Sequence, residues 1–235
     1  MNRFILLLLV LAASSALQAA IPSVTVNQAG GQGDPTNASP VVFTAVFSEA
    51  VSGFTDTDVA FTGSTVGGTL AATVSTADNI TWTINVTGMS GTGTVVASIP
   101  AAVCVSVSTA EDNTQSTSTD NTVTFDNDAP SVTVNQAGAQ ADPTNAATIN
   151  FTATFSETVT GFTSAGVTIG GTATGTLVAN VTGSGTTYNV AISGMLTSGT
   201  VIVTVNASAA QDAAGNNSTT RGLAIAAGER GTKGL

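Results

Sequence analysis

The chain has 235 residues, of which 14 are acidic and only 4 are basic, giving a formal net charge of −10. No Lys or Arg lies between Phe4 and Thr220. Nucleic acids and anionic membrane surfaces are therefore poor candidates as partners, because binding to either requires basic side chains. Divalent cations suit the charge better. The chain also has no histidine, which removes Ser-His catalysis and His-containing zinc sites.

Residues 1–20 are predicted to be a secretory signal peptide. A charged start at Arg3 precedes an apolar run over residues 4–13, and small residues follow as far as Ala20. The apolar run is short for a bilayer span, although an N-terminal membrane anchor is the alternative. Cleavage near Ala19 or Ala20 predicts a secreted or cell-surface protein without membrane insertion after signal removal. A lone cysteine, Cys104, leaves no intrachain disulfide, and we expect it to be a packed residue.

The rest of the chain contains two copies of one unit. The segment "PSVTVNQAGGQGDPTNASPVVFTAVFSEAVSGF" begins at Pro22, and "PSVTVNQAGAQADPTNAATINFTATFSETVTGF" begins 108 residues later, at Pro130. We therefore expect a first domain with an acidic linker over residues 21–129 and a second domain over residues 130–226. Residues 227–235 match nothing upstream and form an atypical tail. Later in the copies, Asp112 is paired with Asp212, 100 residues further on.

Apolar residues shared by the two copies alternate with polar ones, which is typical of half-buried strands. The segment 43–47 repeats Phe, Ala and Phe at every second position, and residues 151–155 do the same. In the same way Trp82 matches Tyr188, and both are predicted to be core residues. Seven short strands in each unit of about 100 residues predict an antiparallel β-sandwich. Further strands of the first copy are expected at residues 24–28, 59–63, 69–75, 94–99 and 122–126.

These motifs resemble the bacterial Ig-like domains found in tandem in secreted adhesins and other surface proteins. The resemblance is carried by "SVTVNQA", "DPTN", "FSE", "DAAGN" at residues 212–216 and the "STDNTVTFDNDAP" linker at residues 118–130. It covers residues 21–220 and implies two tandem Ig-like β-sandwiches in an all-β chain. It also implies a spacer, stalk or adhesive role, with calcium stiffening several members of such arrays and neighbouring Ig-like repeats in the parent protein.

The chain is predicted to be no enzyme. Glu49 and Glu157 are related by the repeat, one in each copy, so they do not form a paired-carboxylate active site. The expected function is a non-catalytic secreted or cell-surface spacer, stalk or adhesion module with a cell-surface or glycan ligand. The alternatives are a carbohydrate-binding accessory module of a secreted enzyme and, third, a fragment of an enzyme that continues beyond Leu235.

The acidic residues suggest a calcium site at the linker. Ig-like topology implies that Glu157 and Asp212 of the second domain face the linker residues Asp126 and Asp128, while Asp34 approaches from the first domain. Such a cluster repels itself unless a cation screens it, and Ca²⁺ prefers carboxylate and carbonyl oxygens. The alternative is that these acids are solvated turn residues that cap loops and oppose aggregation.

Overall fold

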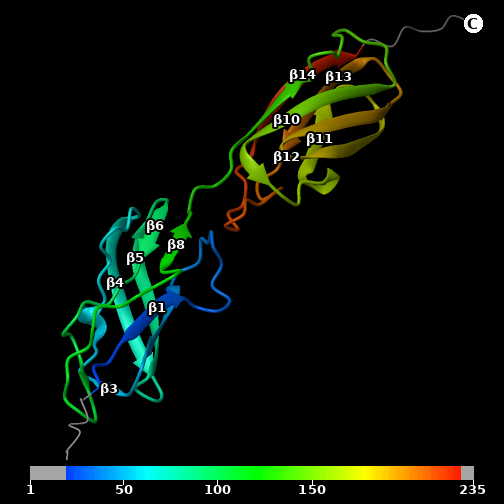
Figure 1. The fold of residues 1–235 in the computed structure, drawn as a ribbon. Coiled ribbons are helices and arrows are strands. Elements are labelled where there is room, and N and C mark those ends of the chain that lie inside the picture. Colours follow the sequence, from blue (N-terminus) through cyan, green and yellow to red (C-terminus); the bar gives the residue numbers. More distant parts are fainter. Residues whose placement is uncertain (1–19, 229–235) are drawn as a thin grey trace, which may run out of the picture.

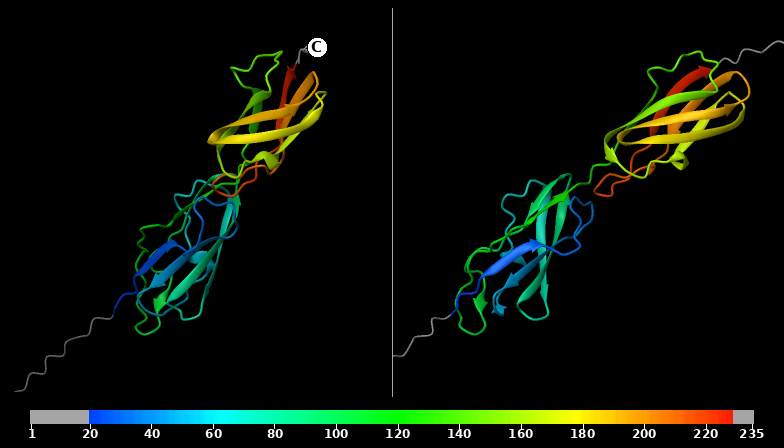
Figure 2. Two further views of the ribbon diagram at one scale, coloured as in Figure 1. Left: turned by 90° about the vertical axis from the view of Figure 1, so that its right-hand side faces the viewer. Right: turned by 45° about the vertical axis from the view of Figure 1, so that its right-hand side comes forward.

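Two β-sandwiches lie end to end, joined by a short linker (Figure 1). The structure is a computed structural model that describes residues 20–228. The expected signal peptide lies outside the described residues except for Ala20, and the expected tail does so from Glu229 onward. Figure 2 shows the same end-to-end arrangement from two further directions. The all-β sandwich architecture predicted from the sequence is confirmed.

The first sandwich contains one four-stranded sheet, in the order β1-β2-β5-β4, and two two-stranded sheets, β3-β7 and β6-β8. Neighbouring strands pair antiparallel throughout these sheets. The elements are β1 (Val24–Gln28), β2 (Val41–Phe47), β3 (Val51–Ser52), the 3-10 helix η1 (Asp56–Asp58), β4 (Gly67–Thr76), β5 (Thr81–Ser90), β6 (Gly93–Val96), β7 (Val105–Ser106) and β8 (Thr122–Phe125).

The second sandwich packs two three-stranded sheets, β12-β10-β9 and β11-β13-β14. The long strand β12 contains both arms of a hairpin, because the backbone at Gly175 lies against Gly194 and that at Gly183 lies against Thr187. The elements are β9 (Val132–Gln136), β10 (Thr148–Val159), the 3-10 helix η2 (Ser164–Gly166), β11 (Val167–Gly171), β12 (Gly175–Met195), β13 (Gly199–Val205) and β14 (Arg221–Gly228).

Each sandwich has its own hydrophobic core, built from the residues that alternate along its strands. The repeated Phe, Ala and Phe positions of β2 and β10 are at most 3% exposed, as the period-2 pattern predicts. Trp82 and Tyr188 are core residues too, at 9% and 6% exposure. Each packs edge-on in an aromatic cluster, Phe47-Phe54-Trp82 in the first sandwich and Phe155-Phe162-Tyr188 in the second. Such edge-on pairs contribute about 0.5–1.5 kcal/mol beyond their buried area.

One expected strand is absent from the first sandwich. Residues 59–63 form a single bridge, Ala60 with Ser98, that follows the turn η1. The turn forms because Asp58 Oδ2 accepts hydrogen bonds from Thr55 N (2.7 Å) and Thr55 Oγ1 (2.8 Å), which caps it. The second sandwich has a real strand, β11, after its own turn η2. The prediction of a strand at residues 59–63 was therefore wrong.

Cys104 is a packed residue, as expected. It is 3% exposed, and burial raises the pKa of its thiol to about 11, with the negative charges of Asp58 and Asp112 adding to the effect. The thiolate is the nucleophilic and metal-binding form of cysteine. Cys104 therefore remains an unreactive thiol at neutral pH.

Candidate functional site

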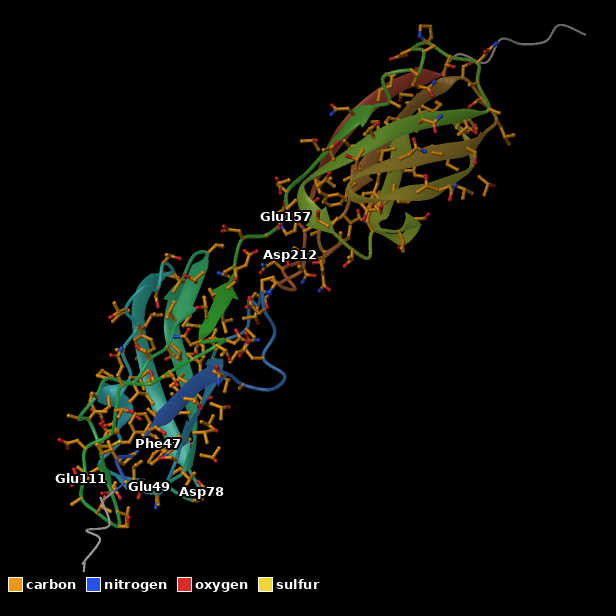
Figure 3. All side chains as sticks on the ribbon, viewed as in Figure 1. Phe47, Glu49, Asp78, Glu111, Glu157 and Asp212 are labelled. Atoms are coloured by element: carbon orange, nitrogen blue, oxygen red, sulfur yellow. The ribbon has the colours of Figure 1, made fainter. Side chains whose placement is uncertain are left out.

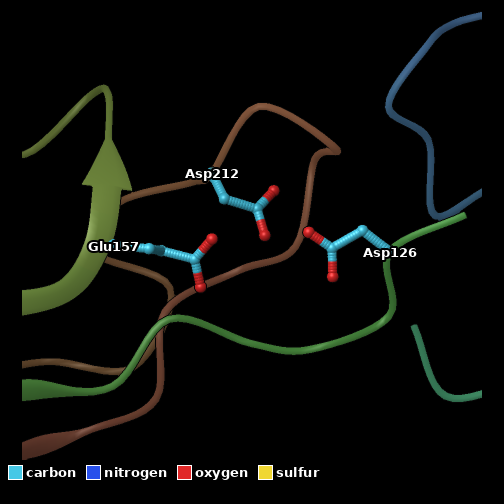
Figure 4. Close-up of side chains that lie close together, drawn as sticks. All are labelled: Asp126, Glu157 and Asp212. Carbon is cyan, nitrogen blue, oxygen red and sulfur yellow. The ribbon is translucent and has the colours of Figure 1, made fainter. Parts of the chain in front are cut away.

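Three of the five predicted acidic residues gather where the two sandwiches meet. Asp126 follows β8 at the start of the linker, Glu157 lies near the end of β10, and Asp212 lies in the loop after β13. One carboxylate oxygen from each of the three lies within 4.8 Å of the others. Figure 4 shows the three side chains pointing toward one another, and Figure 3 places Glu157 and Asp212 at the junction.

Strand alternation places Glu157 at the rim of the second core. Phe155 and Val159, two residues to either side, are buried, so Glu157 shares their side of the strand. The register of β10 against β12 shifts between Thr154 and Val159, which marks a bulge or irregularity at this point. The carboxylate is therefore partly buried instead of fully solvated.

Asp212 is held in place by the loop that it begins. The side chain is 6% exposed, and its two oxygens accept hydrogen bonds from Asn216, Oδ1 from the backbone N (2.8 Å) and Oδ2 from Nδ2 (2.9 Å). Gly215 has a φ of +94°, a left-handed conformation that glycine adopts without strain and that turns the loop back. The loop thus fixes a buried carboxylate with neutral amide donors.

Asp126 is tied to the first sandwich. Its backbone N donates to Thr36 O (2.9 Å), and its Oδ1 accepts from Thr92 Oγ1 (3.0 Å) and from Asp128 N (3.1 Å). Its carbonyl oxygen accepts a hydrogen bond from Asn216 Nδ2 of the second sandwich (2.9 Å). The first linker residue therefore contacts both sandwiches.

The structure does not bring Asp34 or Asp128 into the three-residue group. Asp34 is exposed, and its Oδ1 accepts a hydrogen bond from Thr124 N at 2.9 Å, which is a contact within the first sandwich. Asp128 is also exposed, and it acts on the group through its charge. The expected convergence of five carboxylates therefore reduces to three, and the carboxylate of Asp34 instead faces strand β8 of its own sandwich.

The group carries negative charge without a basic neighbour in sequence, since no Lys or Arg lies between Phe4 and Thr220. Burial is the largest cause that raises the pKa of Glu157 above its ordinary value of 4.5, and the charge of Asp212 is the next. The charges of Asp126 and Asp128 raise it further. A proton or a cation at this position would relieve the repulsion.

The three carboxylates fit a hard cation such as Ca²⁺. Two oxygens bound to one calcium ion at 2.3–2.6 Å lie at most about 5 Å apart, so the 4.8 Å spread allows all three to share an ion. The candidate ligand atoms are all carboxylate oxygens, without a thiol or an imidazole, which suits calcium or magnesium and not zinc. Monodentate and bidentate carboxylates, carbonyls and water together supply the six to eight oxygens that Ca²⁺ takes.

Sequence analysis missed two amides that organise this group, Asn37 and Asn216. Both lie within repeated or recognisable motifs, "DPTN" for Asn37 and "DAAGN" for Asn216. Asn37 Nδ2 donates to Asn216 Oδ1 (3.0 Å), which joins the first sandwich to the loop of Asp212. Clustered acidic residues are visible in a sequence, whereas neutral amides carry no charge that distinguishes them from other polar residues.

At the far end of the first sandwich, Glu49 occupies the position that corresponds to Glu157, but its neighbours differ. Ser106 pairs with Val51, and its N donates to Glu111 O, as Asp212 N donates to Asn216 O. Ser106 is thus the structural counterpart of Asp212, so the pairing of Asp112 with Asp212 was wrong. Here Glu49 Oε2 accepts hydrogen bonds from Ser106 Oγ (2.7 Å) and Ser108 Oγ (2.9 Å). Two hydroxyls replace the second carboxylate.

Comparison with known proteins finds a family model that matches part of the chain. Residues 126–227 match the family model described as the bacterial Ig-like domain. The second sandwich, together with the linker residues from Asp126, is thus similar in sequence to a bacterial Ig-like domain. The matched segment contains all three residues of the acidic group, because it begins at Asp126.

Among solved structures, the chain is similar to the adhesin InvE of Yersinia pseudotuberculosis, with 16% sequence identity and a TM-score of 0.29. The alignment covers 84% of this chain and 58% of that one, so the chain spans little more than half of the adhesin's length. No curated protein matches the chain. Within residues 20–228, the structure contains no helix with the length and apolar composition needed to cross a bilayer.

Proposed function

We propose that this protein is a non-catalytic stalk or adhesion module of a secreted or cell-surface protein, and that Ca²⁺ stiffens the joint between its two sandwiches. The observation that carries the proposal is the group formed by Asp126, Glu157 and Asp212, whose carboxylate oxygens lie within 4.8 Å of one another. The bacterial Ig-like domain and the sandwich fold support the stalk role. The absence of histidine from the sequence supports a non-catalytic role.

The position of the group explains how a bound ion would act mechanically. Asp126 is hydrogen-bonded to Thr36 and Thr92 of the first sandwich, whereas Glu157 and Asp212 belong to the second. An ion held by all three carboxylates would cross-link the linker and the second sandwich at one point. Bending at the linker would then require a ligand to leave the ion, which stiffens the stalk.

Calcium would also stabilise the fold. Extracellular calcium modules bind with dissociation constants on the order of 10⁻⁴ to 10⁻³ M. For a dissociation constant of about 0.3 mM and about 10 mM Ca²⁺, ligand linkage adds about 2 kcal/mol to the free energy of unfolding. Burial, followed by the charge of Asp212, raises the pKa of Glu157. A bound ion would relieve the repulsion between the carboxylates and would compete with a proton for Glu157.

Calorimetric titration of the full chain with Ca²⁺ tests the proposal. We expect one site of submillimolar to millimolar affinity, and a loss of affinity of at least about tenfold in Glu157→Gln, which removes one ligand charge. The matched control is Glu49→Gln, because Glu49 is the repeat counterpart at the far end of the first sandwich (Figure 3). Glu49→Gln should bind like the parent protein.

Two results would count against calcium: no binding heat at millimolar Ca²⁺ with an unchanged melting temperature, or an equal loss of affinity in both variants. The alternative, a carbohydrate-binding module, has less support. Sugar rings stack on exposed aromatic faces, whereas Trp82 and Tyr188 are buried in their cores. A glycan array separates the two functions, because a stalk should give no saturable signal.

A further inference from the structure

We propose that Asn37 and Asn216 form a latch that docks the first sandwich onto the second without any metal ion. The latch is defined as the hydrogen bonds that these two residues make across the joint. It rests on the proposed role as a stalk, since it makes the stalk rigid, but it does not rest on calcium binding. The joint would then be a specific docking surface as well as a candidate cation site.

On the first sandwich, the latch is presented by a well-fixed loop. Thr36 is 6% exposed, its N donates to Thr124 O (3.0 Å), and its carbonyl accepts from Asp126 N (2.9 Å). Asp34 Oδ1 accepts from Thr124 N beside it (2.9 Å). Asn37 therefore extends from a loop that is anchored on both sides to the end of β8. Its position on the first sandwich needs no contact from the second.

Asn37 makes two hydrogen bonds to the second sandwich. Its backbone N donates to Ala214 O (3.2 Å), and its side-chain Nδ2 donates to Asn216 Oδ1 (3.0 Å). The contact also fits sterically, because a Cβ added at Gly215 would still lie 3.7 Å from the nearest Asn37 atom. One loop of each sandwich thus meets the other through directed polar contacts.

Asn216 is the central residue, and its amide can adopt only one orientation. The residue is 7% exposed, and Nδ2 donates both to Asp126 O and to Asp212 Oδ2 (2.9 Å each), while Oδ1 accepts from Asn37. A flipped amide would point its oxygen at two acceptors and its NH₂ at the NH₂ of Asn37. The two acceptors and the one donor around this amide therefore specify one arrangement, as buried polar networks do when every member has a partner.

Asn216 also stabilises one acidic side chain of the joint, through hydrogen bonds inside its own loop and without a cation. Two amide N–H groups, from the backbone and side chain of Asn216, point at Asp212, and none of these bonds requires metal. Donors to a charged acceptor make stronger hydrogen bonds than neutral pairs do. Asparagine thus takes the place of the basic residues that this part of the sequence lacks.

The repeat supplies a matched control. Asn145 ends the second "DPTN" motif as Asn37 ends the first, and Asn145 is exposed. Its neighbour Thr144 lines a small cavity with Gly199, where β13 begins, whereas Asp212 follows the end of β13. Asn145 therefore lies at the end of the second sandwich away from the joint. The same substitution there should leave the joint unchanged.

Backbone ¹⁵N relaxation of the full chain in excess EDTA tests the latch. In the parent protein and in Asn145→Ala, we expect both sandwiches to share one rotational correlation time. In Asn37→Ala, loss of the side-chain donor should weaken docking by about fivefold, the factor for one hydrogen bond. The undocked fraction then rises, and the correlation times of the two sandwiches should shorten and differ from each other. Asn37→Asp keeps the shape but turns an acceptor toward Asn216 Oδ1, so it should undock further than Asn37→Ala, with Asn145→Asp as its control.

The latch is overturned if the parent protein tumbles as two independent bodies in EDTA, or if both Asn37 variants keep one shared correlation time. If Asn37→Ala unfolds, the isosteric Asn37→Asp decides the question alone. Calcium plays no part in this measurement. A protein that binds no Ca²⁺ but stays docked in EDTA would refute the calcium proposal and keep the latch, whereas the opposite pattern would do the reverse.

Discussion

Asp78 and Glu157 show how local donors decide the behaviour of a carboxylate. Asp78 sits in the turn between β4 and β5, where its Oδ1 accepts hydrogen bonds from Thr81 N (2.7 Å) and Ile80 N (2.9 Å). The bond from Thr81, followed by that from Ile80, lowers the pKa of Asp78. The pKa of Glu157 is instead raised, first by burial and then by the charge of Asp212. The pKa values of these two carboxylates therefore shift in opposite directions.

Asp78→Asn should destabilise the first sandwich at neutral pH and have little effect in strong acid. Because the pKa of Asp78 is lower in the folded state, its contribution to the free energy of unfolding is present above the ordinary value of 3.8 and is lost as the pH falls through the lowered value. Thermal melts at a series of pH values should show the parent and variant curves converging below that range. Parallel curves across the whole series would contradict the role assigned to this carboxylate.

At the scale of elements, the sequence predicts strands well and loops less well. The alternation of apolar residues in β2 and β5 identified core positions correctly, because period-2 burial is a property of any half-buried strand. The turn η1 was not predicted, because Thr55 and Asp58, which cap it, look like ordinary polar residues in the sequence. The residues that follow them have the composition of a strand. Asp112 was paired with the wrong residue because the loops of the two copies differ in length. The correct correspondence follows from the bridges that the two loops make.

Gly194→Ala should destabilise the second sandwich by about 3 kcal/mol or more, because a strained backbone and a steric clash coincide there. Gly194 has a φ of +89°, and a Cβ at this position would lie 2.0 Å from Thr176 O of the facing hairpin arm. The control is Gly170→Ala in β11, where a Cβ would meet only Ile202 Cβ, at 3.8 Å. That change should stay within about 0.5 kcal/mol. Denaturant unfolding of both variants measures the difference, and equal values would contradict the clash.

For the whole molecule, the sequence predicted the place of the site better than its composition. Glu157 and Asp212 could be assigned to one end of a sandwich from Ig-like topology, and the repeat identified the linker that faces them. Asp34 lies outside the three-residue group, and its carboxylate accepts a hydrogen bond from Thr124. Asn216 was omitted because a neutral amide becomes visible only when its partners are placed around it. The charged residues of a sequence therefore indicate where such a group lies, whereas its complete set of residues follows only from the hydrogen bonds in the structure.

The latch and the proposed calcium site should be thermodynamically coupled, because Asn216 contacts both Asn37 and the carboxylate of Asp212. Linkage is reciprocal, so a change that weakens docking by about fivefold should weaken calcium binding by up to the same factor if binding needs the docked joint. We therefore expect Asn37→Ala, which removes no calcium ligand, to raise the calcium dissociation constant by up to about fivefold, with Asn145→Ala unchanged. Calorimetric titration at fixed ionic strength measures the calcium dissociation constants of both variants.

The control repeats the comparison in an Asn216→Ala background. There Asn37→Ala should have no effect on calcium binding, because the substitution acts through Asn216. Equal dissociation constants for the parent and Asn37→Ala would instead mean that the linker and the second sandwich assemble the site without help from the first.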